Sequence, residues 1–237
     1  STFAYEKHIP LIILGGGSNT VFADGIINAF VIRIKADQVS IFSVRPPHPI
    51  RTPPGEGKIV TVQSGKILAS LINELAEQNL DLSPLTGIPG TVGGAIFGNA
   101  GQGPQGTWIG SYVEYIECFT DGKWRTYPKD ECKFSYRESA FKKMLSPIIW
   151  SVAFSVPSKP TSDIKSAIER LIQKRIETQP HLKTAGSCFK GVDGIPAWKL
   201  IDNAGLRGKK LGDIQIAEKH ANFLLNAGQG TFEDAKK

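Results

Sequence analysis

The segment from Pro84 to Gly106 constrains this chain more than any other, because glycine is concentrated there. It holds eight of the 25 glycines in 23 residues, whereas the remaining 214 residues hold 17. Apolar residues stand between these glycines, which a solvated loop would not need. Such a backbone can lie flat against a large planar ligand, with Thr91 and Asn99 offering polar contacts. The segment therefore predicts a ligand-binding loop, and a tightly packed loop between strands is the alternative.

A second glycine motif stands at residues 15–19, directly after an apolar run. Its three glycines would let backbone N–H groups approach an anion, and Ser18 and Asn19 can add side-chain hydrogen bonds. The motif lacks the G-x-G-x-x-G spacing of dinucleotide-binding loops. It therefore indicates either a phosphate site or a simple flexible turn.

Charge and apolar patterning argue against several classes of protein. Residues 157–237 carry +5 of the net charge of +6, which suits a small anionic ligand or a solvated surface. Nucleic acid is not expected as a partner, because no recognition-helix pattern or aromatic-rich strand motif accompanies the charge. A membrane is not expected either, because the longest apolar stretches fall short of the roughly 18 residues that a span needs.

The three cysteines, Cys118, Cys132 and Cys188, are an odd number without the spacing of a metal site. The four histidines are scattered as well, so we expect no metal ion and a reducing compartment. Cys188 has no obvious paired histidine, and we expect a buried structural thiol there. The single His220 at the start of a strand is expected to be structural.

Hydrophobic periodicity predicts a mixture of helices and strands. Strands are expected at residues 11–14, 29–34, 59–63, 112–119, 148–156 and 221–226, with an exposed loop at 45–57. One helix is expected to begin at Ile67. A second is expected from a capping Ser162 to just before Pro180, with Ile172 on its apolar face. Two more are expected, one between residues 196 and 205 and one from Thr231. Two prolines and a change in charge near residue 157 predict a domain boundary that divides residues 1–156 from 157–237.

Two polar segments contain the remaining residues that are candidates for catalysis or ligand binding. The stretch Tyr136–Ser139 includes Arg137, whose rigid guanidinium fork suits a carboxylate or a phosphate; an ordinary surface arginine is the alternative. The stretch Gly186–Lys190 includes Ser187, which is a nucleophile, a proton donor or a plain turn residue. The G-x-S-x-G elbow of serine hydrolases is absent.

Seven segments, in this order, resemble the UDP-N-acetylenolpyruvoylglucosamine reductase family and together cover nearly the whole chain. The resemblance implies an α+β protein with an FAD-binding domain of the vanillyl-alcohol-oxidase type, made of two lobes, and a C-terminal α+β substrate-binding domain. The stretch His220–Phe223 resembles the shorter subtype, which lacks an extra substrate-covering insertion. The matching segments are residues 14–19, 87–95, 99–101, 136–139, 185–190, 201–208 and 220–223.

The resemblance assigns both glycine motifs to bound FAD, with the pyrophosphate at the first motif and the isoalloxazine along the second. The residues that it implies for FAD are Gly15, Gly16, Gly17, Ser18, Asn19, Gly87, Ile88, Pro89, Gly90, Thr91, Gly93, Gly94, Asn99 and Gly101. Those that it implies for the substrate are Arg137, Lys190 and Tyr136.

The resemblance also implies a reaction. In this family a hydride passes from NADPH through FAD to the terminal alkene carbon of UDP-N-acetylglucosamine enolpyruvate, which gives UDP-N-acetylmuramate for peptidoglycan. Arg137 would neutralise the charge that develops on the carboxyl side, and Ser187 would donate a proton to the adjacent carbon. We therefore expect a monomeric enzyme of the bacterial cytoplasm that serves cell-wall synthesis, cell shape and cell division.

Several positions depart from the family pattern. Gly191 stands where the family has asparagine, and Gln102–Gly106 replaces an alanine, a tyrosine and a glycine. The family's catalytic glutamate, and the first strand and helix of its N-terminal lobe, are expected outside residues 1–237, and Glu233 falls too early to serve. Two alternatives stay open: an FAD-dependent sugar or alcohol oxidase on the same fold, and a non-catalytic FAD or UDP-sugar binding module.

Overall fold

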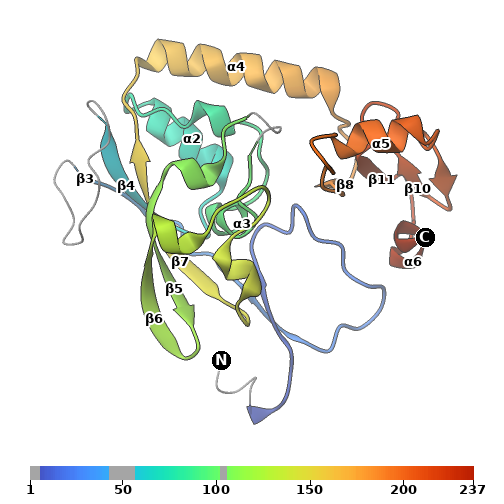
Figure 1. Ribbon diagram of the computed structural model, residues 1–237, viewed down its shortest axis with the longest axis horizontal. Coiled ribbons are helices and arrows are strands. Elements are labelled where there is room, and N and C mark those ends of the chain that lie inside the picture. The colour runs from blue at the N-terminus through green and yellow to red at the C-terminus, as the bar shows by residue number, and fades with distance from the viewer. Residues whose placement is uncertain (1–5, 43–56, 102–105) are drawn as a thin grey trace. The chain divides into compact units, whose positions relative to one another are not determined.

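The computed structural model describes residues 6–42, 57–101 and 106–237. The chain divides into two compact units, the first made of residues 1–16 and 29–171 and the second of residues 17–28 and 172–237. Helices and strands are mixed in both, which confirms the α+β class (Figure 1). The expected loop at residues 45–57 and most of the stretch 102–106 lie outside the described residues. No helix in the described ranges is long and apolar enough to cross a membrane.

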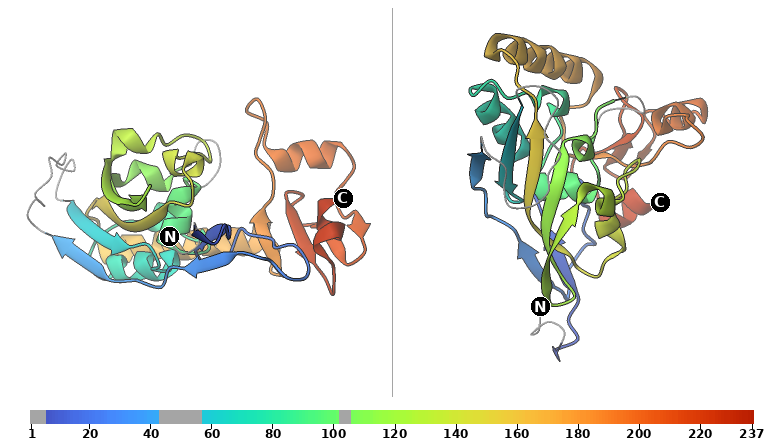
Figure 2. Two further views of the ribbon diagram at one scale, coloured as in Figure 1. Left: turned by 90° about the horizontal axis from the view of Figure 1, so that it is seen from below. Right: turned by 60° about the vertical axis from the view of Figure 1, so that its left-hand side comes forward.

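A five-stranded antiparallel sheet is the framework of the first unit, with its strands in the order β3-β4-β7-β5-β6. Helices α2 and α3 pack on one face of it (Figures 1 and 2). The periodicity misses β3 and β6, because both are edge strands whose residues are mostly half-buried or exposed. The strands are β3 (Val39–Phe42), β4 (Lys58–Gln63), β5 (Val113–Thr120), β6 (Lys123–Pro128) and β7 (Ile148–Val156).

The core of the first unit lies between this sheet and helix α2 (Leu68–Ala76). Val60 of β4 and Phe154 of β7 are fully buried on the same side, as the period of two along a strand requires. Ile67 is the N-cap residue in an extended conformation and is 45% exposed. The helix therefore begins one residue later than predicted, and Ile67 does not belong to its apolar face. The buried face of α2 consists of Leu68, Leu71, Ile72, Leu75 and Ala76.

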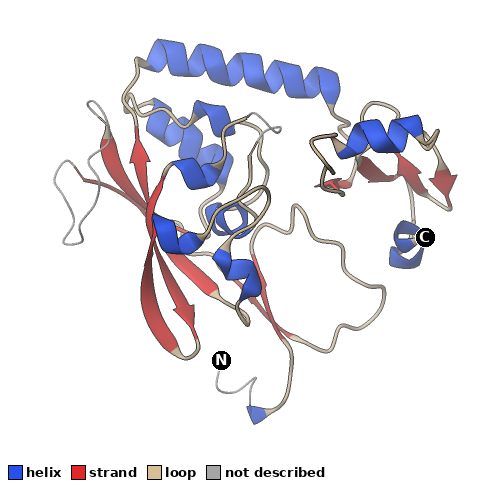
Figure 3. Cartoon of the chain, in the orientation of Figure 1, coloured by secondary structure: helices blue, strands red, loops and turns tan. Residues whose placement is uncertain are grey.

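A small parallel sheet also belongs to the first unit. Strand β1 (Leu11–Leu14) pairs with β2 (Phe30–Arg33), which confirms both predicted strands. A parallel pair cannot be joined by a tight hairpin, and residues 15–29 between the two strands form one long loop without helix or strand (Figure 3). Residues 17–28 of this loop belong to the second unit.

The glycine-rich segment is partly helical, contrary to the loop predicted for it. Helix α3 (Val92–Phe97) occupies its centre, and Thr91 caps the helix by accepting a hydrogen bond from the N–H of Gly94 (3.4 Å). Val92 and Ile96 are four residues apart and fully buried, so a helical spacing explains the apolar residues among the glycines. A short 3₁₀ helix, η1 (Ser83–Leu85), precedes α3 in the chain. Further short 3₁₀ helices follow it: η2 (Ile109–Ser111), η3 (Lys129–Cys132) and η4 (Ala140–Lys143).

A four-stranded antiparallel sheet carries the second unit, in the order β8-β11-β10-β9. Its small apolar core consists of Ala217, Phe223 and Leu225. The helix start predicted at Thr231 is confirmed, because Thr231 and Asp234 form a capping box. The elements of this unit are β8 (Thr184–Ser187), α5 (Ala197–Asn203), β9 (Lys210–Leu211), β10 (Ile214–Ile216), β11 (Phe223–Asn226) and α6 (Phe232–Lys236).

Helix α4 (Thr161–Thr178) begins one residue before the predicted cap. Ser162 is its second residue, and the Ser162 hydroxyl contacts only the carboxylate of the next residue (3.3 Å), so the predicted capping role is wrong. Ile164 and Ile168 are buried, whereas Ile172 is 44% exposed, contrary to the predicted apolar face. The buried residues of α4 that belong to the core of the first unit are Ile164 and Ile168.

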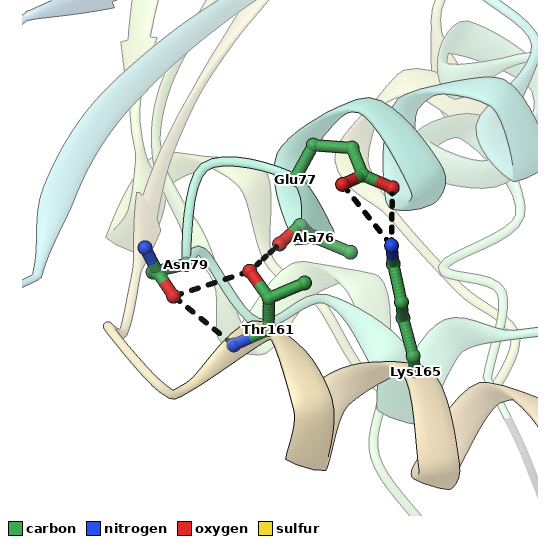
Figure 4. A network of polar contacts seen from close by, with 5 residues as sticks. All are labelled: Ala76, Glu77, Asn79, Thr161 and Lys165. Carbon is green, nitrogen blue, oxygen red and sulfur yellow. Dashed lines mark hydrogen bonds and ion pairs between the residues drawn. The ribbon is translucent and has the colours of Figure 1, made fainter.

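Asn79 caps helix α4 in place of Ser162 (Figure 4). Its Oδ1 accepts a hydrogen bond from the N–H of Thr161 (3.0 Å), and the Thr161 hydroxyl donates to the carbonyl of Ala76 (2.6 Å). An ion pair between Lys165 and Glu77 lies beside them (2.8 Å). Asn79 has a φ of 59°, a left-handed conformation that asparagine tolerates better than most residues. A side chain in the turn that follows α2 therefore caps the start of α4.

The three cysteines differ in exposure. Cys118 and Cys132 are fully buried, and burial raises the pKa of each thiol to about 12. Cys188 is exposed, so the prediction of a buried thiol there is wrong. Its backbone N–H still donates to the carbonyl of Asn222 (2.9 Å), so Cys188 continues the pairing past the end of β8 and is nevertheless exposed.

We expect Asn79→Gly to lower the free energy of unfolding by about 1 kcal/mol, because glycine keeps the left-handed backbone but removes the cap. Asn79→Ala should cost about 1–2 kcal/mol more, because alanine disfavours that backbone. Urea unfolding measures both values. Lys165→Ala removes only an exposed ion pair and is the control, with a change within about 0.5 kcal/mol. Equal effects of the two Asn79 variants would contradict the backbone argument.

Candidate active site

The two glycine motifs contact each other in the first unit, although they lie far apart in the sequence. A Cβ atom on Gly16 would lie 2.9 Å from the Cα of Gly90, and one on Gly15 would lie 2.7 Å from Oγ1 of Thr91. Real Cβ atoms essentially never come so close to other atoms, so only glycine permits this approach of two backbones. The fold thus brings together two motifs that the sequence analysis assigned to one ligand.

The backbone at this contact is open to a ligand. None of the described residues accepts a backbone hydrogen bond from the N–H of Gly15 or Gly16, and Gly16 is exposed. Unpaired N–H groups without side chains in front of them are what a phosphate of a bound dinucleotide needs. These residues therefore fit FAD.

Two adjacent glycines of α3 have different surroundings. A Cβ on Gly93 would lie 2.8 Å from the Cβ of Ser64, and the Gly93 N–H donates to the Ser64 carbonyl (2.8 Å). Gly94 is exposed, and a Cβ there would lie 3.6 Å from its nearest neighbour, Oγ1 of Thr91. Gly93 is therefore required for packing, whereas Gly94 leaves a stretch of backbone surface free.

The turn before α3 contains the next residues predicted for FAD. Gly87 and Gly90 have φ values of 81° and 95°, in the left-handed region that glycine occupies without strain. Ile88 is buried in the core of the first unit, and Pro89 is exposed. The two glycines shape the turn that carries Gly90 to its contact with the first motif.

Arg137 lies in the first unit against an aromatic pair. Its Nη2 donates to the carbonyl of Gly101 (3.0 Å), and its guanidinium carbon lies 5.0 Å from the ring centroid of Trp108. Trp108 meets Tyr136 edge to face, with centroids 5.4 Å apart. A Cβ on Gly101 would lie 2.5 Å from Cε3 of Trp108, so glycine is needed for the indole to lie there. The cation–π contact leaves other N–H groups of Arg137 for a carboxylate.

Arg137 keeps its positive charge at neutral pH. Burial lowers its pKa, while attraction to Tyr136 and a hydrogen bond with it raise the pKa. A guanidinium stays protonated in proteins under such conditions. Because the side chain is half-buried, its charge acts on a neighbouring anion with less screening by water than a surface charge would.

The turn that carries Arg137 is fixed by two side chains of the same stretch. Nζ of Lys142 donates to the carbonyl of Arg137 (2.6 Å). The hydroxyl of Ser139 donates to the carbonyl of Phe97 at the end of α3 (2.7 Å). Arg137 itself has a φ of 57°, so these bonds hold a backbone conformation that a non-glycine residue seldom adopts.

Asn99, which the sequence analysis assigned to FAD, has its side chain bonded to protein backbone. It is 4% exposed; its Nδ2 donates to the carbonyl of Ser135 (2.8 Å), and its Oδ1 accepts from the N–H of Gly110 (3.1 Å). The carboxamide therefore connects the backbone at Ser135, two residues before Arg137, to the backbone at Gly110, two residues after Trp108. A contact of Asn99 with FAD stays a prediction.

Ser187 is the last residue of β8 in the second unit, and its side chain is exposed. Nδ2 of Asn19 donates to the carbonyl of Ala185 on the same strand (2.6 Å). The carboxamide of Asn19 is thus engaged with the strand that carries the serine. A contact of Asn19, or of the half-buried Ser18 beside it, with FAD stays a prediction.

Lys190 and Gly191 follow in the same unit. Lys190 is exposed. A Cβ on Gly191 would lie 2.6 Å from the carbonyl oxygen of Ile195, and Val192 pairs with Ile195 across a tight turn. This turn therefore has no room for a side chain at residue 191 as it is folded here.

The predicted catalytic residues belong to different units, Arg137 to the first and Ser187 to the second. Two residues of the candidate site were not singled out from residue types and spacing: Trp108, which contacts Arg137, and Asn222, which bonds to the backbone after Ser187. Trp108 follows residues 102–106, which depart from the family pattern, and no sequence motif indicated a role for it. Asn222, which bonds to the backbone of Phe189, lies in the stretch 220–223, whose resemblance to the family was the only available signal.

Two parts of this chain match known protein families. Residues 1–125 match the family of FAD binding domains. Residues 178–237 match the C-terminal domain of UDP-N-acetylenolpyruvoylglucosamine reductase. The fold and the paired glycine motifs thus define an FAD-dependent oxidoreductase.

Individual relatives narrow the class. The UDP-N-acetylenolpyruvoylglucosamine reductase of Thermotoga petrophila is 37% identical over 233 residues, covering 97% of this chain and 76% of its own length. That of Aquifex aeolicus is 36% identical over 98% of this chain and 74% of its own length. The crystal structure of the Thermus caldophilus reductase matches with a TM-score of 0.78 and 30% identity, over 99% of this chain and 81% of that chain. The chain belongs to the UDP-N-acetylenolpyruvoylglucosamine reductase family, which confirms the resemblance.

Gly93→Ala is expected to lower the free energy of unfolding by about 1–3 kcal/mol, because the new methyl group meets Ser64. Gly94→Ala should be neutral or stabilising by up to about 1 kcal/mol, because alanine is the better helix former. Thermal unfolding of the FAD-free variants measures both. If FAD covers Gly94, the Gly94→Ala protein stays folded but binds FAD more weakly. Unchanged FAD affinity would remove Gly94 from the cofactor residues.

Trp108→Leu is expected to lower kcat of the full-length enzyme about 2- to 10-fold, since a cation–π contact contributes about 0.5–1.5 kcal/mol. Trp108→Phe keeps an aromatic face and should retain most of the activity. Steady-state kinetics of both variants, with thermal unfolding to check folding, measure the difference. Equal losses in the two variants would show that the aromatic face does not act on Arg137.

Proposed function

We propose that this chain catalyses the NADPH-dependent reduction of UDP-N-acetylglucosamine enolpyruvate to UDP-N-acetylmuramate. Family membership over nearly the whole chain is the observation that carries the proposal. When bound, FAD would supply the chemistry of hydride transfer from NADPH to the alkene of the substrate, and Gly15 and Gly16 are among the residues that would hold it. The residues of this chain then have to hold the substrate carboxylate, stabilise its growing charge and provide a proton.

Arg137 is proposed to hold the carboxylate of the enolpyruvyl group. Addition of hydride to the terminal alkene carbon moves negative charge toward the carboxyl group, so a cation there stabilises the transition state more than the ground state. The carbonyl of Gly101 and the ring of Trp108 already hold the guanidinium without substrate. Little reorganisation is therefore needed when the charge develops.

Ser187 is proposed to donate its hydroxyl proton to the carbon next to the carboxyl group. A serine hydroxyl is a weak acid in water, but a carbon that has just gained an electron pair is a strong base, and enforced geometry then suffices. The position is suitable, because the exposed side chain stands at the end of a strand. The serine regains its proton from solvent after the product leaves.

The remaining assignments are also proposals. Lys190 carries an exposed cation that suits the diphosphate of a UDP-sugar, and the half-exposed Tyr136 lies beside Arg137. We assign residues 1–156 to the FAD-binding domain and 157–237 to the substrate-binding domain. The product serves peptidoglycan synthesis, cell shape and cell division in the bacterial cytoplasm, and we propose that the enzyme acts as a monomer.

The full-length protein is expected to be yellow with FAD, to bleach with NADPH under anaerobic conditions and to recover colour on addition of UDP-N-acetylglucosamine enolpyruvate. Ser187→Ala should bleach normally but recover about 100-fold or more slowly, because general-acid catalysis typically contributes about 10²–10⁴-fold. Stopped-flow absorbance measures both steps.

Three outcomes would count against the proposal. A colourless protein that cannot take up FAD would overturn the enzymatic function. Recovery of colour with oxygen but not with the UDP-sugar would favour an oxidase. An unchanged recovery rate in Ser187→Ala would exclude the serine as the proton donor.

A further inference from the structure

Strand β8 is an edge strand of the second unit's sheet, so within the described part of the chain one side of its backbone has no strand partner. Carbonyl groups two residues apart on a strand point toward the same edge, and Ala185 and Ser187 are such a pair. Nδ2 of Asn19 lies 2.6 Å from the carbonyl oxygen of Ala185 and 3.5 Å from that of Ser187. Asn19 therefore covers the open edge of β8 at the serine.

Asn222 fixes the residues that follow the serine. Its backbone carbonyl accepts from the N–H of Cys188 (2.9 Å). Its Oδ1 accepts from the N–H of Phe189 (3.0 Å), and its Nδ2 donates to the Phe189 carbonyl (2.9 Å). Asn222 is only 7% exposed, so water cannot readily replace these bonds. One side chain thus continues the sheet pairing beyond the end of β8.

The backbone at Ser187 needs such support. The pairing of β8 with β11 shifts register between Phe223 and Leu225, and the serine lies directly opposite Phe223. Gly186, the preceding residue, has a φ of 80° and no side chain to pack. The end of an edge strand beside a glycine and a register shift is a place where local opening is cheap.

We propose that Asn19 and Asn222 are positioning residues for Ser187, two carboxamides that fix the backbone immediately before and after the proton donor. The inference rests on the proposed role of Ser187. The serine oxygen is one rotatable bond from the backbone, so a shift of the backbone moves it directly. A displacement of about 1 Å can cost about 100-fold in rate. Asn19 thereby serves the catalytic strand as well as the glycine motif that contains it.

The test uses the full-length FAD-loaded enzyme and its two separate steps, bleaching by NADPH and recovery with UDP-N-acetylglucosamine enolpyruvate. Asn19→Ala and Asn222→Ala should each slow recovery about 10- to 100-fold. For Asn222→Ala, which removes none of the residues predicted to bind FAD, bleaching should stay within about twofold of the unaltered enzyme. In a Ser187→Ala background the same substitutions should have little further effect, because the group that they position is absent.

Asn226→Ala is the matched control. Asn226 lies on the same strand, β11, and also bonds to backbone groups through its carboxamide, but these belong to Gly228 and Gly230. It should lower the melting temperature without changing the rate of recovery. This control separates the loss of a carboxamide that bonds to backbone on β11 from the loss of serine positioning.

The outcomes distinguish the two proposals. If Asn19→Ala and Asn222→Ala slow recovery by the same factor with Ser187 present and in the Ser187→Ala background, or if Asn222→Ala slows bleaching as much as recovery, the positioning role is wrong. If Ser187→Ala itself recovers at the normal rate, the proposed function of the serine fails instead. Should either alanine variant fold poorly, Asn19→Ser and Asn222→Ser, which keep a small uncharged polar side chain but lack the carboxamide, take its place.

Discussion

The close approach of two backbones at Gly16 and Gly90 is the constraint on which the candidate site depends. A side chain at Gly16 would force the loop after β1 away from the start of α3, and Gly90 has a φ of 95° that glycine adopts without strain. With glycine at both, the first motif lies against Thr91 and Gly94, and open N–H groups stand beside an exposed stretch of helix backbone. The ligand surface is therefore built from main chain, which suits a cofactor whose phosphates need several donors at once.

The two candidate catalytic groups are held in different ways. Arg137 is a long side chain, and it is fixed at its tip by the Gly101 carbonyl and the face of Trp108. Ser187 is short, so its position is set by the backbone, and the bonds from Asn19 and Asn222 act there. In both cases the polar groups are oriented before a substrate is present, which lowers the cost of reorganisation during reaction.

Local patterns predict much of the fold, and the errors share a cause. Long apolar strands such as β4 and β7 and the buried face of α2 follow from the pattern, because period and burial coincide in them. The pattern makes Ser162 a helix cap, whereas the cap comes from Asn79, which is 82 residues from Thr161. It makes the glycine-rich segment a loop, yet α3 forms there because Val92 and Ile96 reach a core that only the folded chain provides. Cys188 is exposed, contrary to expectation, because only the folded chain decides what packs over a residue at the end of a strand.

The sequence by itself determined the family and the two glycine motifs, since these reside in residue types at fixed spacing, and through the family resemblance it indicated two candidate catalytic groups. Tertiary structure decided what those residues touch. Asn99 bonds to backbone, Asn19 supports the strand of Ser187, and Trp108 lies against Arg137. The physical reason is that hydrogen bonds and aromatic contacts join residues far apart in the chain, and their partners exist only once the sheets have brought those residues together.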